Sequence, residues 1–264
     1  MPSDFSFWYE LALKMALTAT IVVAASVAAE RSGPFVGAVI ASLPTAAGAA
    51  YIILAIEHPP AFIATSAVGS IAANAAVAIF AFTYTVLAQR HGMMLSLGAA
   101  MLVWFCCAAV LQTVAWTPVT ALALDIVVFA FTITASRRYL SAMPPGHAVK
   151  RSHLDIPMRA LAAAVVVAVV TTASHHIGSF VSGMFAVFPI VMGSLVVVLH
   201  PRVGGPATAS VFAHAQVPLV GLALGFLAVH HLAVPIGEWW ALLAGLLASV
   251  AWNTMLWAVR RRAA

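Results

Sequence analysis

Residues 32–54 read SGPFVGAVIASLPTAAGAAYIIL, and residues 177–199 repeat the same order as IGSFVSGMFAVFPIVMGSLVVVL. Identical residues recur at an offset of 145 residues, among them Gly33 and Gly178, Phe35-Val36 and Phe180-Val181, Pro44 and Pro189, and Gly48 and Gly193. Each stretch follows a hydrophobic segment and has a proline midway along a second one. Secondary transporters often contain such a duplicated unit, with a helix interrupted at the same depth in each copy. We therefore predict that the chain consists of two related halves within a membrane.

The composition indicates an integral membrane protein. Hydrophobic residues make up 64% of the chain and charged residues 7%, whereas soluble domains contain about 25% charged residues. A spanning helix needs about 20 apolar residues, so 264 residues are taken up by helices and leave no soluble domain. The basic residues lie at helix ends, where they determine topology, and give no reason to expect nucleic acid as a partner. The expected partners are the lipid bilayer and a small-molecule solute; a homodimer is an open alternative for the assembly.

Glycine, proline and clustered polar residues separate the apolar segments. They divide the chain into nine predicted transmembrane helices: residues 8–29, 34–56, 61–88, 93–114, 118–136, 158–175, 179–199, 206–229 and 236–258. The expected fold is all-α and polytopic. Residues 1–137 form a first repeat of five helices, residues 138–157 a basic cytoplasmic linker, and residues 158–264 a second repeat of four helices. The first three helices are expected to correspond to the sixth, seventh and eighth.

The basic residues predict the orientation, because loops rich in lysine and arginine stay in the cytoplasm. With the C-terminus inside, eleven of the 12 basic residues lie on the cytoplasmic side and only Lys14 lies outside. The N-terminus is then outside, and the first helix runs inward while the sixth runs outward. The two halves are therefore expected to be inverted, related by a two-fold axis in the membrane plane. We expect a multi-pass protein of the bacterial inner membrane.

The paired prolines, Pro44 and Pro189, mark a candidate binding site. Proline removes a backbone donor and interrupts a helix, and in a membrane the freed backbone groups must face protein or water. Ser42 and Thr45 flank the first break, and Ser194 follows the second. Half-helix N-termini at these breaks favour a negatively charged group. A single proline would indicate an ordinary kink, whereas the matched pair favours a shared central site.

Polar residues on two other predicted helices add to this site. Ser70 and Asn74 lie one turn apart on the third helix, and His214 and Gln216 lie on the eighth. Serines at such positions often only join helices, with hydrogen bonds worth about 1 kcal/mol, whereas asparagine and histidine are costlier to bury. We predict that these residues contribute to a substrate site between the two repeats, near mid-membrane.

Asp125 is the one carboxylate deep within a predicted helix. A charged side chain there costs at least about 2.5–3.5 kcal/mol, so we expect the carboxyl to be protonated, paired or in a wet cavity. Burial favours the protonated form, as a proton-coupling group requires. We predict that Asp125 couples transport to protons; the alternative is a protonated acid bonded to a neighbouring backbone group.

Histidines and acids gather in the outer loops: Glu57, His58, His175, His176, His230, His231 and Glu238. Such side chains can bind zinc, copper or nickel. The sequence has no HxxxH or CxxC spacing, so we predict no metal site and no cofactor. It also lacks a glycine-rich phosphate loop, a nucleophile elbow and paired carboxylates at depth, so we expect no enzymatic activity.

Two short segments resemble known membrane proteins. Residues 36–66, VGAVIASLPTAAGAAYIILAIEHPPAFIATS, are similar to the core of small GlpM-type inner-membrane proteins. The segments EHPP at 57–60 and LHPRVGGPATAS at 199–210 resemble the His-Pro-Pro signature of the HPP transmembrane family, although Arg202 replaces the second proline. Some HPP proteins are linked to nitrite transport. Both resemblances imply a small polytopic, transporter-like protein.

The duplication, the paired prolines and the sparse polar residues at depth predict a secondary transporter. The expected substrate is a small solute, anionic or neutral and polar, bound at the repeat interface. One alternative is a non-transporting scaffold or accessory subunit in envelope biogenesis, although the short loops leave little surface for partners. A second alternative is a channel, which requires a continuous polar pore lining that these stripes do not provide.

Overall fold

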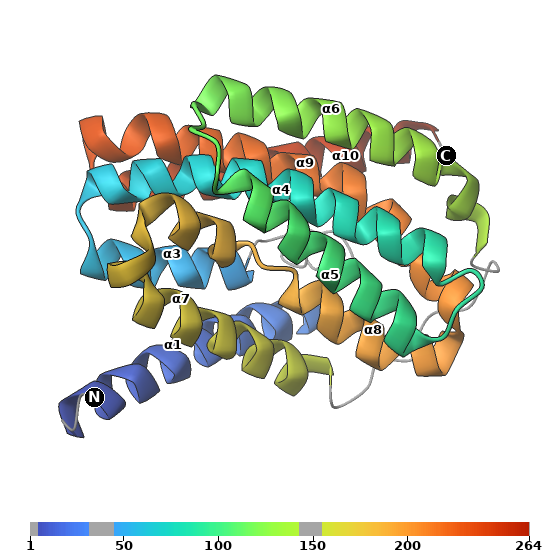
Figure 1. Ribbon diagram of the computed structural model, residues 1–264, viewed down its shortest axis with the longest axis horizontal. Coiled ribbons are helices and arrows are strands. Elements are labelled where there is room, and N and C mark those ends of the chain that lie inside the picture. Colours follow the sequence, from blue (N-terminus) through green and yellow to red (C-terminus); the bar gives the residue numbers. More distant parts are fainter. Residues whose placement is uncertain (1–4, 32–44, 143–154, 264) are drawn as a thin grey trace.

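The computed structural model describes residues 5–31, 45–142 and 155–263, which are almost entirely helical (Figure 1). Their helices are α1 (Phe5–Arg31), α3 (Thr45–Glu57), α4 (Pro60–Leu87), α5 (Met93–Leu111), α6 (Pro118–Ser136), the 3-10 helix η1 (Arg137–Ala142), α7 (Asp155–Ala186), α8 (Ile190–Val203), α9 (Gly205–Ile236) and α10 (Glu238–Ala263). No strand occurs in these ranges. The predicted all-α fold is therefore confirmed for the part of the chain that is described.

Within these described ranges, seven segments are long and apolar enough to cross a membrane, not the predicted nine. One difference is the predicted helix 34–56: residues before Thr45 lie outside the described residues, and α3 has 13 residues, fewer than the roughly 20 that a crossing needs. The other is that predicted helices 158–175 and 179–199 fall within one apolar stretch, residues 156–203. A multi-pass membrane protein remains the architecture that these segments support.

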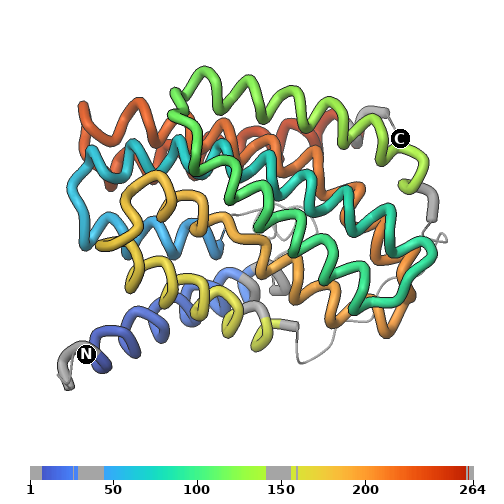
Figure 2. Tube along the Cα trace, viewed as in Figure 1, coloured from blue at the N-terminus to red at the C-terminus, as the bar shows by residue number. Residues whose placement is uncertain are grey.

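The stretch 156–203 contains 48 residues, far more than one crossing needs. Gly178 lies inside it with a φ of 77°, a left-handed conformation that favours glycine. Residues before and after Gly178 run in opposite directions in Figures 1 and 2. A second interruption follows at Pro189, where α7 has ended at Ala186 and α8 begins at Ile190. The repeated proline thus separates two short helical segments.

Helix α4 lies at the centre of the molecule, and most of its residues are buried. It packs against α5, α6, α7 and α9. Pro60 occupies the first turn of α4 after an extended Pro59, where the missing backbone donor costs nothing. Glycines allow α4 and the end of α7 to approach closely: a Cβ on Gly69 would overlap the carbonyl of Phe180, and one on Gly183 the carbonyl of Ser66.

The helix boundaries follow the 145-residue spacing of the sequence repeat. Three pairs of helices begin at positions separated by this spacing: α3 at Thr45 and α8 at Ile190, α4 at Pro60 and α9 at Gly205, and α5 at Met93 and α10 at Glu238. The correspondence reaches α5 and α10, one helix pair beyond the three expected from sequence. The first half contains two further elements, α6 (Pro118–Ser136) and η1, after the helices that correspond to those of the second half.

Candidate functional site

The midpoints of α4 and α9 meet at a buried polar centre. The Asn74 side-chain amide on α4 donates to the Asp125 carboxylate on α6 and to the Leu219 carbonyl on α9, both at 3.2 Å. The side chains of Asn74 and Asp125 are 0% and 2% exposed. The described partner of the Asp125 carboxyl is thus a neutral amide, and which of the three expected environments applies stays a prediction.

Two buried side-chain amide oxygens, one in this centre and one on Gln216 of α9, accept no hydrogen bond from the described protein groups. Asn74 Oδ1 is buried without a hydrogen-bond partner among the described residues, and so is Gln216 Oε1 on α9. Gln216 donates through Nε2 to the Ser136 hydroxyl on α6, at 3.2 Å. An unsatisfied buried acceptor costs about 1–3 kcal/mol, so both oxygens favour a donor such as water, a protonated group or a solute.

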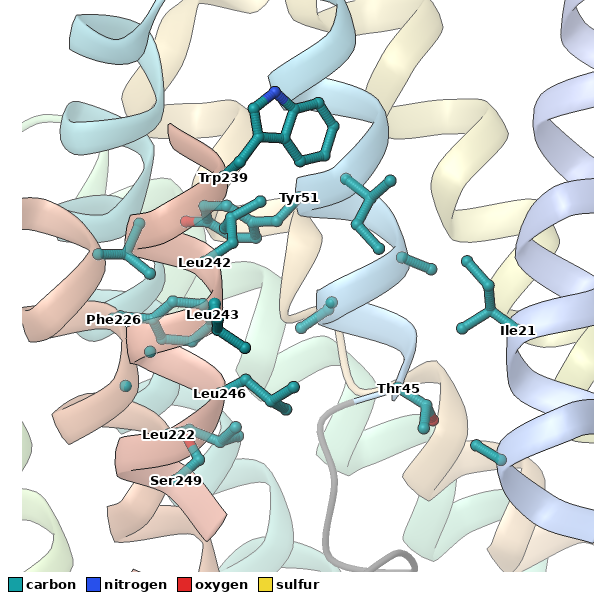
Figure 3. A pocket seen from close by; sticks show the side chains of 18 residues that line it. Ile21, Thr45, Tyr51, Leu222, Phe226, Trp239, Leu242, Leu243, Leu246 and Ser249 are labelled. Atoms are coloured by element: carbon teal, nitrogen blue, oxygen red, sulfur yellow. The ribbon is translucent and has the colours of Figure 1, made fainter. Parts of the chain in front are cut away.

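A cavity of about 410 Å³ lies between α1, α3, α9 and α10. Figure 3 shows Thr45 at one end of it, Trp239 at the other, and Ile21 of α1 across from Leu243 and Leu246 of α10. This volume falls within the range of about 300–1,000 Å³ that small-molecule sites occupy. The cavity is therefore large enough for a small solute.

The cavity wall is almost wholly apolar, and its hydroxyl groups are largely committed to protein partners. The Tyr51 hydroxyl lies 2.7 Å from the Ser70 hydroxyl, which donates to the Gly183 carbonyl at 2.7 Å. The Ser249 hydroxyl donates to the Gly221 carbonyl at 2.9 Å. The wall thus suits a molecule with a largely apolar body.

A smaller cavity of about 170 Å³ lies beside the break at Pro189. Three of its lining residues match lining residues of the larger cavity at the 145-residue spacing: Val166 with Ile21, Val170 with Ala25, and Ile190 with Thr45. The two cavities therefore occupy related places, one beside the start of α3 at Thr45 and one beside the start of α8 at Ile190.

Side chains of α5 occupy the space beside α8 that corresponds to the larger cavity beside α3. Trp104 stands at the position that corresponds to Ser249, and its ring packs edge-on against Phe188 with centroids 4.8 Å apart. Met101 occupies the space beside Gly193, whereas the space beside the matching Gly48 is open. At this corresponding position α5 thus carries a large residue, Trp104, and α10 a small one, Ser249.

The other predicted site residues do not gather at one point. Ser42 and Pro44 lie outside the described residues. Ser194 donates to the Val191 carbonyl of its own helix at 2.7 Å. His214 is exposed, and its Nδ1 bonds to the Ser210 carbonyl at 2.9 Å. The predicted set therefore divides into the cavity wall (Thr45 and, through Tyr51, Ser70), the polar centre (Asn74 and Asp125), Gln216 with Ser136, and residues bonded within their own helices.

Tyr51 and Ser249 line the cavity but were not predicted from sequence as site residues. In the sequence, nothing distinguishes Tyr51 from the apolar residues around it. The contrast between Ser249 and Trp104 becomes visible only when α10 is aligned with α5, a pairing that the shorter predicted repeat left out.

No family model matches the chain, and neither a curated protein nor a solved structure is significantly similar to it. The likeness to GlpM-type and HPP proteins therefore depends on the short segments quoted above.

Proposed function

We propose that the chain is a secondary-transporter-like protein that binds a small solute with an apolar body and one polar or anionic group. One observation supports this above all: a cavity of about 410 Å³ beside the start of α3, within a bundle of apolar helices. In transporters with inverted repeats, sites lie where the repeats meet and where helices are discontinuous. In this proposal the cavity lies where the two repeats meet, and the helix interruption predicted at Pro44 directly precedes α3.

The contacts across the molecule support an inverted duplication. Asn74 and Leu219 are separated by 145 residues and contact each other. In a two-fold arrangement, equivalent residues meet only where the axis passes, so we infer an axis between α4 and α9. The packing of α5 on α8, matched by that of α10 on α3, agrees with this axis. The bacterial inner membrane is the location that we propose with it.

The cavity refines the substrate class expected from sequence. Its apolar wall favours hydrocarbon over a compact polar ion, because desolvating a polar group without hydrogen bonds costs about 2–7 kcal/mol. The start of α3 at Thr45 lies at one end of the cavity, and the positive end of a helix favours a negative group. An amphiphilic anion satisfies both conditions.

Asp125 is the coupling group in this proposal. Its carboxylate accepts from the Asn74 amide, which also bonds α9. Gain or loss of a proton at Asp125 changes the strength of this charge-assisted bond. Protonation would thereby alter the link between α4, α6 and α9, the helices across which the two halves must move.

Proteoliposomes test the function with hexanesulfonate, a permanently charged anion with an apolar chain, and with hexyltrimethylammonium as its cationic counterpart. Saturable uptake of the anion, driven by a pH gradient and exceeding that of the cation, is expected. Asp125→Asn should abolish gradient-driven accumulation and preserve counterflow exchange. Uptake equal to that of protein-free vesicles for both probes would contradict transport of this solute class.

The scaffold and channel alternatives make different predictions in this assay. A scaffold gives no saturable uptake. A channel conducts without counterflow, and its pore needs a continuous polar lining, whereas the cavities of the described residues are apolar.

Fusions at the two chain ends test the topology that belongs to this proposal. Because basic residues divide eleven to one between the sides, a reporter after Ala264 should report cytoplasm and one near Met1 periplasm. Alkaline phosphatase and green fluorescent protein activities measure this. Both ends on the same side would refute the inverted orientation of the two halves.

A further inference from the structure

We propose that Glu57, His58 and His175 form a binding site for a divalent cation, with Zn²⁺ as the best match. One potential ligand atom from each residue lies within 4.8 Å of the others. Glu57 ends α3, His58 follows it, and His175 belongs to α7. The site joins segments more than a hundred residues apart in the chain, so no local sequence motif announces it.

The ligand set matches the chemistry of zinc. Two imidazoles and one carboxylate, with a fourth position left for water, are a recurring ligand set for Zn²⁺. His175 Nε2 lies 4.0 Å from Glu57 Oε2. Donor atoms bound to one Zn²⁺ are each about 2.0–2.2 Å from it, so these side chains need to close by only a small movement.

The neighbours of His58 hold its ring in a state suited to a metal. The Ser174 hydroxyl donates its one hydrogen to the Thr171 carbonyl at 2.9 Å, so it accepts from His58 Nε2, 2.8 Å away. This assignment leaves the lone pair of the neutral ring on Nδ1. The ring also stacks on Phe62, with centroids 3.8 Å apart. Such hydrogen bonds fix the tautomer and orientation of histidine ligands in metal sites.

Lys14 of α1 competes for the carboxylate in this site. Its ammonium group forms an ion pair with Glu57 Oε1, and the Glu57 side chain is only 11% exposed. Among the described residues Lys14 is the charged partner of the carboxylate, and His175 Nε2 lies 4.0 Å from Glu57 Oε2. A bound Zn²⁺ takes over the neutralising role of Lys14, so removal of the Lys14 charge should strengthen metal binding.

Calorimetric titration of Zn²⁺ into the full chain tests the site. The protein is purified in detergent through a tag without histidine and stripped with a chelator. We expect saturable binding of one Zn²⁺, weakened at least about tenfold by His175→Ala and tightened about tenfold by Lys14→Met. His175 is 58% exposed, so its substitution leaves the packing intact. His176→Ala, which changes the exposed neighbour, should leave the affinity unchanged.

A second comparison of variants tests Glu57, the buried ligand. Glu57→Gln is combined with Lys14→Met, so that no charge is left unpaired, and the double variant should lose at least about tenfold in affinity relative to Lys14→Met alone. Thermal melting confirms that each variant is folded. Absence of saturable binding in the Lys14→Met protein, or equal affinities with and without His175, would overturn the proposal.

Discussion

Ser249→Trp is expected to abolish hexanesulfonate binding while the protein stays folded. The first half of the chain already carries tryptophan at the corresponding position, Trp104 on α5, where the ring is fully buried. Ser249 on α10 lines the cavity, so an indole at this position would take up space that the solute needs. The variant also loses the hydroxyl bond to Gly221, worth about 1 kcal/mol. Hexanesulfonate should raise the Tm of the detergent-solubilised wild type, and this increase should disappear in the variant.

Two variants control for the substitution itself. Ser249→Ala removes the same hydroxyl but keeps the cavity open, so it should retain the increase in Tm. Leu102→Trp adds the same ring on α5, where Leu102 is 65% exposed, and should also retain it. Equal Tm increases in Ser249→Trp and in the wild type would place the binding site outside this cavity.

Gly183→Ala is expected to destabilise the protein by at least about 3 kcal/mol, the upper end of overpacking costs. The new methyl group would overlap the Ser66 carbonyl, and backbone atoms cannot rotate away as a side chain does. Separation of the two helices would also break the Ser66 bond to the Ser179 carbonyl at 2.9 Å and the Ser70 bond to the Gly183 carbonyl at 2.7 Å. Unfolding in mixed micelles of increasing denaturing detergent measures the effect.

Gly98→Ala on α5 is the matched control, because no atom of a neighbouring segment lies within 4 Å of the added methyl group. Alanine in place of a helical glycine should stabilise this helix by about 0.5–1 kcal/mol. If both variants unfold at the same detergent fraction as the wild type, the close approach of α4 and α7 is not a determinant of stability.

Sequence was sufficient for the features that depend on local composition. Apolar segments predicted an all-α membrane protein, and Pro189 predicted the helix interruption that separates Ala186 from Ile190. The turn at Gly178 was read as a loop between helices, whereas helical residues continue on both sides of this single left-handed residue. Local pattern gives the position of such a break but not its geometry.

The contacts that build the candidate sites join residues far apart in the chain. Asn74 and Asp125 were each identified as costly to bury, but nothing in their spacing indicated that they bond to each other. Glu57, His58 and His175 were placed in one outer-loop cluster, but a metal site was rejected because their spacing matches no motif with ligands from one helix or loop. The cavity was not predicted from sequence, because an empty volume depends on the side-chain sizes of several residues that lie far apart in the chain.

The enclosed position of α4 has a consequence for biogenesis. The polar side chains of this helix, Ser66, Ser70 and Asn74, bond to α7, α6 and α9, all of which are synthesised after it. Ser70 also bonds to Tyr51 of α3, which is synthesised earlier, but a newly inserted α4 meets lipid before the Asn74 amide and the Ser66 hydroxyl have their partners, at about 2–7 kcal/mol for each group without a partner. Retention beside the insertion machinery until α9 emerges avoids this cost. A ribosome that stalls before α9 would release a chain whose central helix exposes polar groups to the bilayer, a feature that membrane quality-control proteases can recognise.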